Sequence, residues 1–143
     1  MKKTTNNKGF SLIELIIVIA IMAVLVAIIA PNLTKYLGSS KKNTDKKNAD
    51  ELASQIQTCI TDYETENGYI GACTIDWSST GASCTTGGNA TFASMLNAAV
   101  TSSTESKESK NSYASATVAL KDSTRPEDGY TITVFLGNAS VQK

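Results

Sequence analysis

One acidic side chain lies at the start of the most apolar stretch of the chain. Glu14 directly precedes residues 15–30, sixteen residues without a polar side chain that we call the apolar segment. With Phe10, Leu12 and Ile13 ahead of it, this stretch approaches the roughly 20 residues that cross a bilayer as a helix. A carboxylate inside hydrocarbon costs about 2.5 to 3.5 kcal/mol on insertion scales, so Glu14 should lie at the interface or have a compensating partner. Glu14 is therefore a candidate functional residue.

The nine residues before Phe10 form a basic leader that ends in glycine. Lys2, Lys3 and Lys8 supply its positive charge, and Gly9 is its last residue. An ordinary secretory signal places its apolar core before the cleavage site, whereas a cut between Gly9 and Phe10 would leave the apolar segment in the mature protein. We therefore expect a cleaved leader followed by a retained hydrophobic helix.

Together these features resemble the N-terminus of a type IV prepilin, the precursor of the subunit of type IV pili and related filaments. The resemblance covers the leader, the Gly9/Phe10 cleavage site, Glu14 as the fifth residue after the cut, and Pro31 closing the apolar segment. It implies an α+β fold in which a long N-terminal α-helix packs on the small antiparallel β-sheet of a globular domain. It also implies methylation of the Phe10 amine, and assembly in which this amine pairs with Glu14 of a neighbouring subunit.

The resemblance also implies partners and a location. The partners would be further pilin subunits in a homopolymer, a prepilin peptidase that cuts and methylates, an assembly ATPase and a membrane platform protein. The chain would be a single-pass membrane protein before assembly and then part of an extracellular pilus that supports adhesion, surface motility or biofilm formation. The alternatives are a minor pilin or pseudopilin of a secretion or DNA-uptake system, a membrane-tethered adhesin that never polymerises, and a plain membrane anchor.

The composition argues against several other classes of protein. The 143 residues include no histidine, which removes the usual general base, the common nucleophile pairs and the commonest zinc ligand. Thirteen basic and thirteen acidic side chains balance in the full chain, and loss of the three leader lysines leaves ten against thirteen. Nucleic-acid binding needs a basic surface, which this balance does not provide. We expect no catalysis, no cofactor and no nucleic-acid partner.

Three acids near the C-terminus, Asp122, Glu127 and Asp128, could suggest a calcium loop. Their spacing does not match a known oxygen-ligand loop, and Arg125 lies among them. We therefore interpret this segment as a solvated turn and expect no metal site.

The three cysteines allow at most one intramolecular disulfide. Cys73 and Cys84 would close a loop rich in Gly, Ser and Thr, and we favour this pair if the domain is exported into oxidising surroundings. A crosslink of this loop size stabilises a fold by about 2 to 3 kcal/mol. The alternative is three reduced thiols, with Cys59 as a small apolar core residue.

Residues 10–67 are expected to form one long helix. Beyond Pro31, apolar side chains recur every three or four residues on one face, from Ala49 to Tyr63. Gly68 can adopt the left-handed conformation that ends helices. Because Pro31 removes one backbone donor, we expect a kink near residues 27–31 that sets the angle of the globular domain. The alternative is a proline at the membrane exit without a mechanical role.

Alternating and helical patterns predict the rest of the fold, and the sheet should have fewer strands than the four usual in type IV pilins. The expected elements are a packed loop (69–89), a second helix starting after Asn89 or Ala90, a mobile exposed loop (101–112), strands (113–121 and 130–136) joined by a hairpin loop (122–129), and an edge strand in 138–143. The expected division is a leader (1–9), a transmembrane or filament-core helix (10–31) and a globular domain (32–143) that includes the second half of the helix.

Charge is segregated along the long helix. Its lysines come first, at positions 35, 41, 42, 46 and 47, and its acids come last, at positions 62, 64 and 66. This order opposes the helix dipole, so it does not stabilise an isolated helix. Staggered parallel copies could place the lysines of one subunit against the acids of another, and the alternative is an ordinary solvated face.

Overall fold

The computed structural model describes residues 9–86, 90–109, 112–122 and 124–143, so residues 1–8 of the expected leader lie outside the described residues. The chain divides into two compact units, residues 1–37 and residues 38–143, and we call the second unit the head. Helix α1 (Leu12–Asn67) contributes residues to both units. Each unit is described by itself below.

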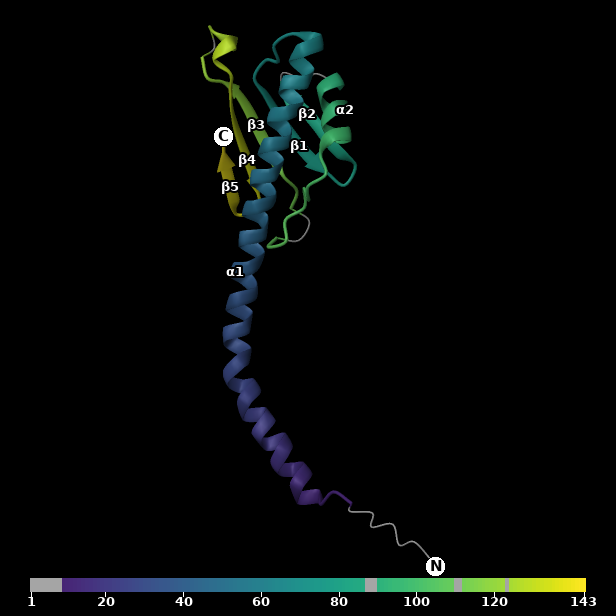
Figure 1. Ribbon diagram of the computed structural model, residues 1–143, viewed down its shortest axis with the longest axis vertical. Helices are drawn as coiled ribbons and strands as arrows, with labels where there is room; N and C mark the ends of the chain where they lie inside the picture. Colours follow the sequence, from purple (N-terminus) through teal and green to yellow (C-terminus); the bar gives the residue numbers. More distant parts are fainter. Residues whose placement is uncertain (1–8, 87–89, 110–111, 123) are drawn as a thin grey trace, which may run out of the picture. The chain divides into compact units, whose positions relative to one another are not determined.

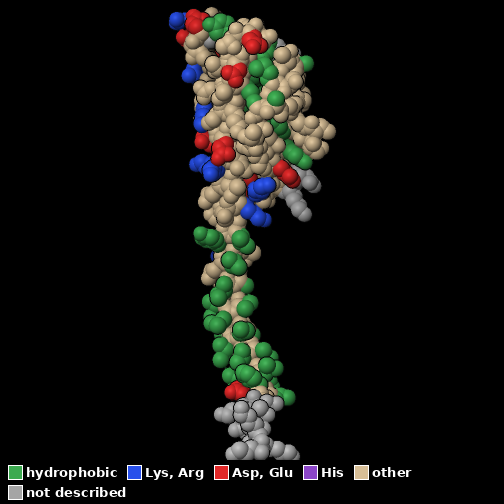
Figure 2. Space-filling model, turned by 45° about the vertical axis from the view of Figure 1, so that its right-hand side comes forward, with side chains coloured by type: hydrophobic (Ala, Val, Ile, Leu, Met, Phe, Trp, Pro, Cys, Tyr) green, Lys and Arg blue, Asp and Glu red, His purple; other side chains and the backbone are tan. Residues whose placement is uncertain are grey.

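In the first unit, the chain becomes helical at Leu12, two residues after the expected start at Phe10. The helix continues through Pro31 without interruption. Apolar side chains are exposed along this part of α1, and Figure 2 shows them as green atoms over the visible surface of the segment. The unit therefore has no hydrophobic core of its own.

The head contains a five-stranded antiparallel sheet with the strand order β2-β1-β3-β4-β5. The head part of α1 lies across one face of this sheet, and α2 lies beside β1 and β2 (Figure 1). The long apolar helix and the small antiparallel sheet are those of the predicted α+β fold. The remaining elements are β1 (Cys73–Ser78), β2 (Gly81–Thr86), α2 (Ala90–Ala99), β3 (Ser115–Leu120), the 3₁₀ turn η1 (Pro126–Asp128), β4 (Tyr130–Leu136) and β5 (Ala139–Gln142).

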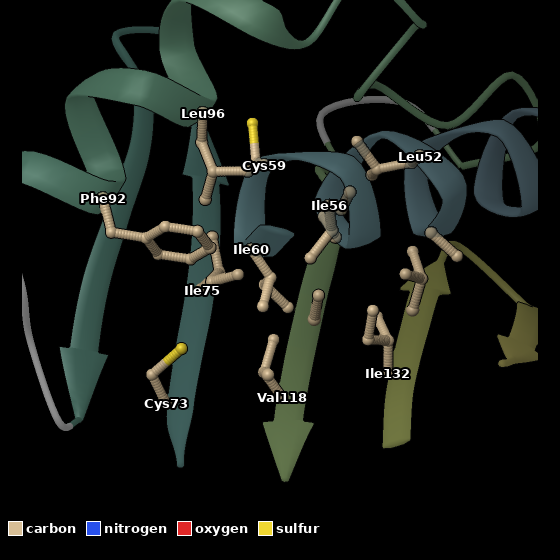
Figure 3. Close-up of a cluster of buried hydrophobic side chains, with 14 of the residues drawn as sticks. Leu52, Ile56, Cys59, Ile60, Cys73, Ile75, Phe92, Leu96, Val118 and Ile132 are labelled. Carbon is tan, nitrogen blue, oxygen red and sulfur yellow. The ribbon is translucent and has the colours of Figure 1, made fainter. Parts of the chain in front are cut away.

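The core of the head lies between α1 and the sheet (Figure 3). The predicted helix face is buried there because its apolar residues recur every three or four positions. Alternate strand residues point to the same side, so one face of each strand joins this core. From α2, Phe92 and Leu96 are fully buried, and the Phe92 ring packs edge-on against Tyr63 at 5.7 Å between ring centroids.

The end of α1 and the C-terminal strands agree with the sequence expectations. The helix ends at Asn67, and Gly68 follows with a φ of 82°, the left-handed conformation that a side chain would disfavour. Helix α2 begins at Ala90, at the expected place, while Asn89 lies outside the described residues. Strands β3, β4 and β5 occupy the three predicted regions.

The expected packed loop at residues 69–89 is wrong, because β1 and β2 form a hairpin there. The predicted number of strands is also wrong. Fewer than four strands were expected, and the described residues form five. In β1, the buried residues Cys73, Ile75 and Trp77 alternate with less buried ones. This alternation was readable in the sequence, but the Gly-, Ser- and Thr-rich surroundings favoured a loop.

The expected exposure of residues 101–112 is also wrong at the centre of that loop. Ser106 is only 5% exposed and donates a hydrogen bond of 2.6 Å to the carboxylate of Asp45 on α1. The backbone N–H groups of Lys107 and Glu108 donate to the same carboxylate at 2.7 and 3.0 Å. We call these contacts the Asp45 anchor, and they fix the loop to the helix.

Gly137, in the turn between β4 and β5, completes this junction. Its φ is +59°, and a Cβ atom there would lie 2.5 Å from the Ser106 hydroxyl and 3.5 Å from the Asp45 carboxylate. A side chain at this position would displace the anchored loop. The anchor thus joins α1, the loop and the end of the sheet.

The head is expected to fold without the apolar segment, because residues 38–143 supply its entire core. A shortened chain beginning at Lys35 should therefore be soluble and unfold cooperatively. Size-exclusion chromatography and thermal unfolding would measure both properties. Aggregation, or unfolding without a cooperative transition, would contradict the division of the chain into two independent units.

Candidate functional site

The N-terminal end of α1 carries a local contact between two residues of the predicted site. The carboxylate of Glu14 accepts a hydrogen bond of 3.3 Å from the backbone N–H of Ser11. Ser11 directly precedes the first helical residue, Leu12, so the pair forms one half of a capping box. Sequence reasoning missed this role, although Ser-x-x-Glu before an apolar run is its usual signal. Glu14 therefore has a structural task inside its own chain.

Gly9 and Phe10 are exposed and lie ahead of the helix. A Cβ atom added at Gly9 would meet nothing within 4 Å, and the side chain of Phe10 is 87% exposed. No packing inside the described chain requires a glycine at position 9. The junction is open to another protein, as a processing site must be.

The apolar segment exposes its side chains. Its large residues are about half exposed or more. By length and composition, α1 is able to cross a membrane. An apolar surface of this extent needs lipid or other protein to cover it, because exposure to water costs about 25 cal/mol per Å².

The structure supplies an unusual bonding pattern around Pro31. Proline has no N–H, so the carbonyl of Ala27 loses its usual helical donor. Thr34 lies three residues after Pro31, and its hydroxyl donates a hydrogen bond of 2.7 Å to the carbonyl of Ala30. Such side-chain bonds compete with the backbone ladder and often accompany helix bending. The kink at Pro31 stays a prediction.

Two of the three cysteines lie on neighbouring strands. Cys73 is on β1 and Cys84 on β2, where Cys84 faces Ile75 across the hairpin next to a bulge. Burial, and secondarily the nearby Cys84, raise the pKa of Cys73 to about 11. Burial also raises the pKa of Cys59, which is a core residue at 2% exposure. The Cys73–Cys84 disulfide stays a prediction.

Oxidation is expected to stabilise the head if this pair forms. A crosslink of about 2 to 3 kcal/mol would raise the melting temperature by roughly 10 °C in a domain of this size. Thermal unfolding with and without a reductant measures the difference, and Cys84→Ser should abolish it. Three titratable thiols in the protein isolated without reductant would argue against the pair.

The acids near the C-terminus have partners within their own turn. The Asp122 carboxylate accepts hydrogen bonds from the backbone N–H and the hydroxyl of Thr124, which lower its pKa. Arg125 lies 3.5 Å from Glu127 and 3.8 Å from Asp128. Across the described ranges, no three His, Cys, Asp or Glu side chains are grouped to hold a metal ion.

Comparison with known proteins gives the N-terminal residues a context. Residues 4–30 match the family model of the prokaryotic N-terminal methylation motif. Over 134 residues the chain is 29% identical to the type IV major fimbrial protein FimA of Dichelobacter nodosus, covering 94% of this chain and 74% of the relative. It is also similar to the type IV major pilin protein PilA of Myxococcus xanthus, with 48% identity over 47 residues.

A third relative is the competence protein ComGC of Bacillus subtilis, which is 32% identical over 62 residues. The ComGC match covers 43% of this chain and 59% of the relative, and the PilA match covers 33% and 21%. The chain thus spans only part of these two relatives. No solved structure matches the chain significantly.

Proposed function

We propose that this chain, a member of the type IV prepilin family, is a structural subunit that polymerises through its N-terminal helix into a type IV pilus. The observation that carries the proposal is the methylation motif on an apolar helix whose side chains are exposed. In the membrane, lipid would cover this helix. In a filament, the helices of other subunits would replace the lipid.

The proposal includes processing at the Gly9/Phe10 junction. A prepilin peptidase would remove residues 1–9 and methylate the new Phe10 amine. The exposure of Gly9 and Phe10, and the match of residues 4–30 to the methylation motif, support this step. An assembly ATPase and a membrane platform protein would then move the single-pass subunit into an extracellular pilus, which would serve adhesion, surface motility or biofilm formation.

The Glu14 carboxylate would neutralise the Phe10 amine of a neighbouring subunit during assembly. Both charges would otherwise be isolated among apolar helices, where a lone charge is strongly disfavoured. Glu14 is exposed and accepts a single 3.3 Å hydrogen bond from the described residues, which leaves the carboxylate accessible to a neighbouring amine. The pair would also set how far one subunit is shifted along the next.

A second candidate function is that of a minor pilin or pseudopilin, favoured by the similarity to the competence protein ComGC. A membrane-tethered adhesin that never polymerises is the third. The similarity to FimA along 94% of the chain favours the major subunit. Mass spectrometry of sheared surface filaments separates the three, since it reports the abundance of the subunit and its N-terminus.

The mature chain is expected to begin at Phe10 with a methylated amine, and Gly9→Leu should accumulate as uncleaved precursor. A Cβ atom at position 9 would meet no described residue within 4 Å, so the loss would reflect recognition by the peptidase. Gly38→Leu is the matched control, because Gly38 is also free of neighbours and lies away from the junction. Intact mass and N-terminal peptide mapping report the outcome. A mature chain that starts elsewhere would contradict the assignment.

A further inference from the structure

The first part of the head helix presents lysines without partners. Lys41, Lys42 and Lys46 are exposed, and none forms an ion pair with another described residue. The nearest acid in sequence, Asp45, turns its buried carboxylate toward the anchored loop instead. Lys47 has only a weak, exposed contact of 3.8 Å with Glu51. This stretch, residues 41–46, therefore carries uncompensated positive charge.

The far end of the same helix carries the opposite charge. Asp62 and Glu66 are exposed, and neither forms an ion pair with another described residue. The last turn of α1 contains no basic residue, although the helix dipole favours one there. Acids at the C-terminal end of a helix are unfavourable within a single subunit. This indicates that the basic groups that neutralise them lie outside the chain.

A cleft of about 360 Å³ lies at the same end of α1, but Asp62 and Glu66 are not among the residues that line it. The acids of the cleft have partners within the chain, because Glu64 accepts a hydrogen bond from the Tyr130 hydroxyl and Glu127 lies 3.5 Å from Arg125. The acids without an ion pair to another described residue are therefore Asp62 and Glu66, which we call the acidic end of α1.

We propose that the lysines of residues 41–46 in one subunit pair with Asp62 and Glu66, at the acidic end of α1, in a neighbouring copy of this chain. The two surfaces differ and are complementary, so the contact is heterologous and propagates from copy to copy. Positions 42 and 62 are 20 residues apart along the helix. At 1.5 Å per residue, neighbouring parallel copies would be shifted by about 30 Å.

Charge also disfavours the alternative alignment. Parallel copies without a shift would place lysines beside lysines and acids beside acids, and such like-charge contacts are repulsive. A shifted alignment removes this repulsion and pairs the unpartnered groups. The inference rests on the proposed function, because only a polymer brings copies together in this way.

The test uses full-length chains with reversed charges as the sole subunit. Lys42→Glu with Lys46→Glu, and separately Asp62→Lys with Glu66→Lys, should each lower the number of surface filaments roughly tenfold or more. Combining all four substitutions restores the complementarity and should recover most filaments. Thr117→Glu, an exposed change on the face of β3 opposite to its buried residues, should leave the count unchanged. Immunoblots of membrane-held subunit check that each chain is made and retained.

Carbodiimide crosslinking of wild-type filaments supplies a second measurement that needs no variant. Mass spectrometry should find amide bonds between Lys41, Lys42 or Lys46 and an acid at position 62 or 66. Along α1 these groups are separated by about 24 to 38 Å, at 1.5 Å per residue, so they cannot form such a bond within a chain and each crosslink would join two copies.

Several outcomes would overturn the docking inference. One is that the variant with all four substitutions forms no more surface filaments than the two double variants, and that wild-type filaments contain no such crosslinks. Another is a lysine reversal that lowers membrane retention of the unassembled subunit, because the lysines would then bind lipid headgroups. If the wild-type chain forms no filaments, the proposed function fails as well, which distinguishes the two failures.

Discussion

The Glu14→Ala chain is expected to form at least roughly tenfold fewer filaments, although it should still be made, cleaved and held in the membrane. The reason is that loss of one member of a buried charge pair costs about 3 to 5 kcal/mol. The unpaired Phe10 amine would remain among apolar helices, and the contact that sets the shift between subunits would be lost. Counts of surface filaments by electron microscopy, with immunoblots of membrane-held subunit, measure the effect.

Two further variants separate this role from the helix cap. Glutamine also accepts the N–H of Ser11, so Glu14→Gln keeps the capping contact and loses only the charge. If the charge pair matters, Glu14→Gln should behave like Glu14→Ala, while Glu14→Asp should lose less. Normal filament numbers with Glu14→Gln would assign Glu14 to the cap, and failed cleavage would assign it to processing.

Asp45→Ala is expected to destabilise the head by about 3 kcal/mol, because two backbone N–H groups and one hydroxyl lose a buried acceptor. For a domain of this size the melting temperature should fall by roughly 12 °C or more. Thermal unfolding of the full chain in detergent micelles, followed by the fluorescence of the buried Trp77, measures the loss. Asp50→Asn is the matched control, since Asp50 is exposed and its one ion pair among the described residues is with Lys143.

The Asp45 anchor also predicts how stability depends on pH. Burial alone would raise the pKa of Asp45, but the hydrogen bonds from Lys107, Ser106 and Glu108 outweigh it and lower the pKa below its usual value. A carboxyl whose pKa is lower in the folded state stabilises the fold above its unfolded pKa of about 3.9. This contribution is lost as the pH falls through the folded pKa.

Wild-type stability should therefore decline below about pH 4, and Asp45→Ala should lack the part of this decline that Asp45 causes. The free energy of unfolding, measured in a pH series for both chains, gives the comparison. Equal stability of the two chains at pH 7 would refute a structural role for the anchor.

The sequence by itself determined the features whose signals are local. The basic leader, the Gly9/Phe10 junction, Glu14 and the apolar segment are contiguous, and their match to the methylation motif needs no folded structure. The core face of α1 and the strand β4 were also readable, because the periodicity of their apolar residues follows from helix and strand geometry. Gly68 marked the helix end by its conformational freedom.

Only the tertiary structure decided the features that depend on distant contacts. Strands β1 and β2 are rich in small and polar residues, and their hairpin is held by β3, which pairs with β1, and by α2, which packs against β2. Asp45 lies four residues before Ala49, in register with the core face of α1, but a carboxylate at such a position is not expected to be buried. Its partners come from 61 to 63 residues further along the chain. A buried carboxylate is stable only when donors converge on it, and chain folding alone brings those donors together.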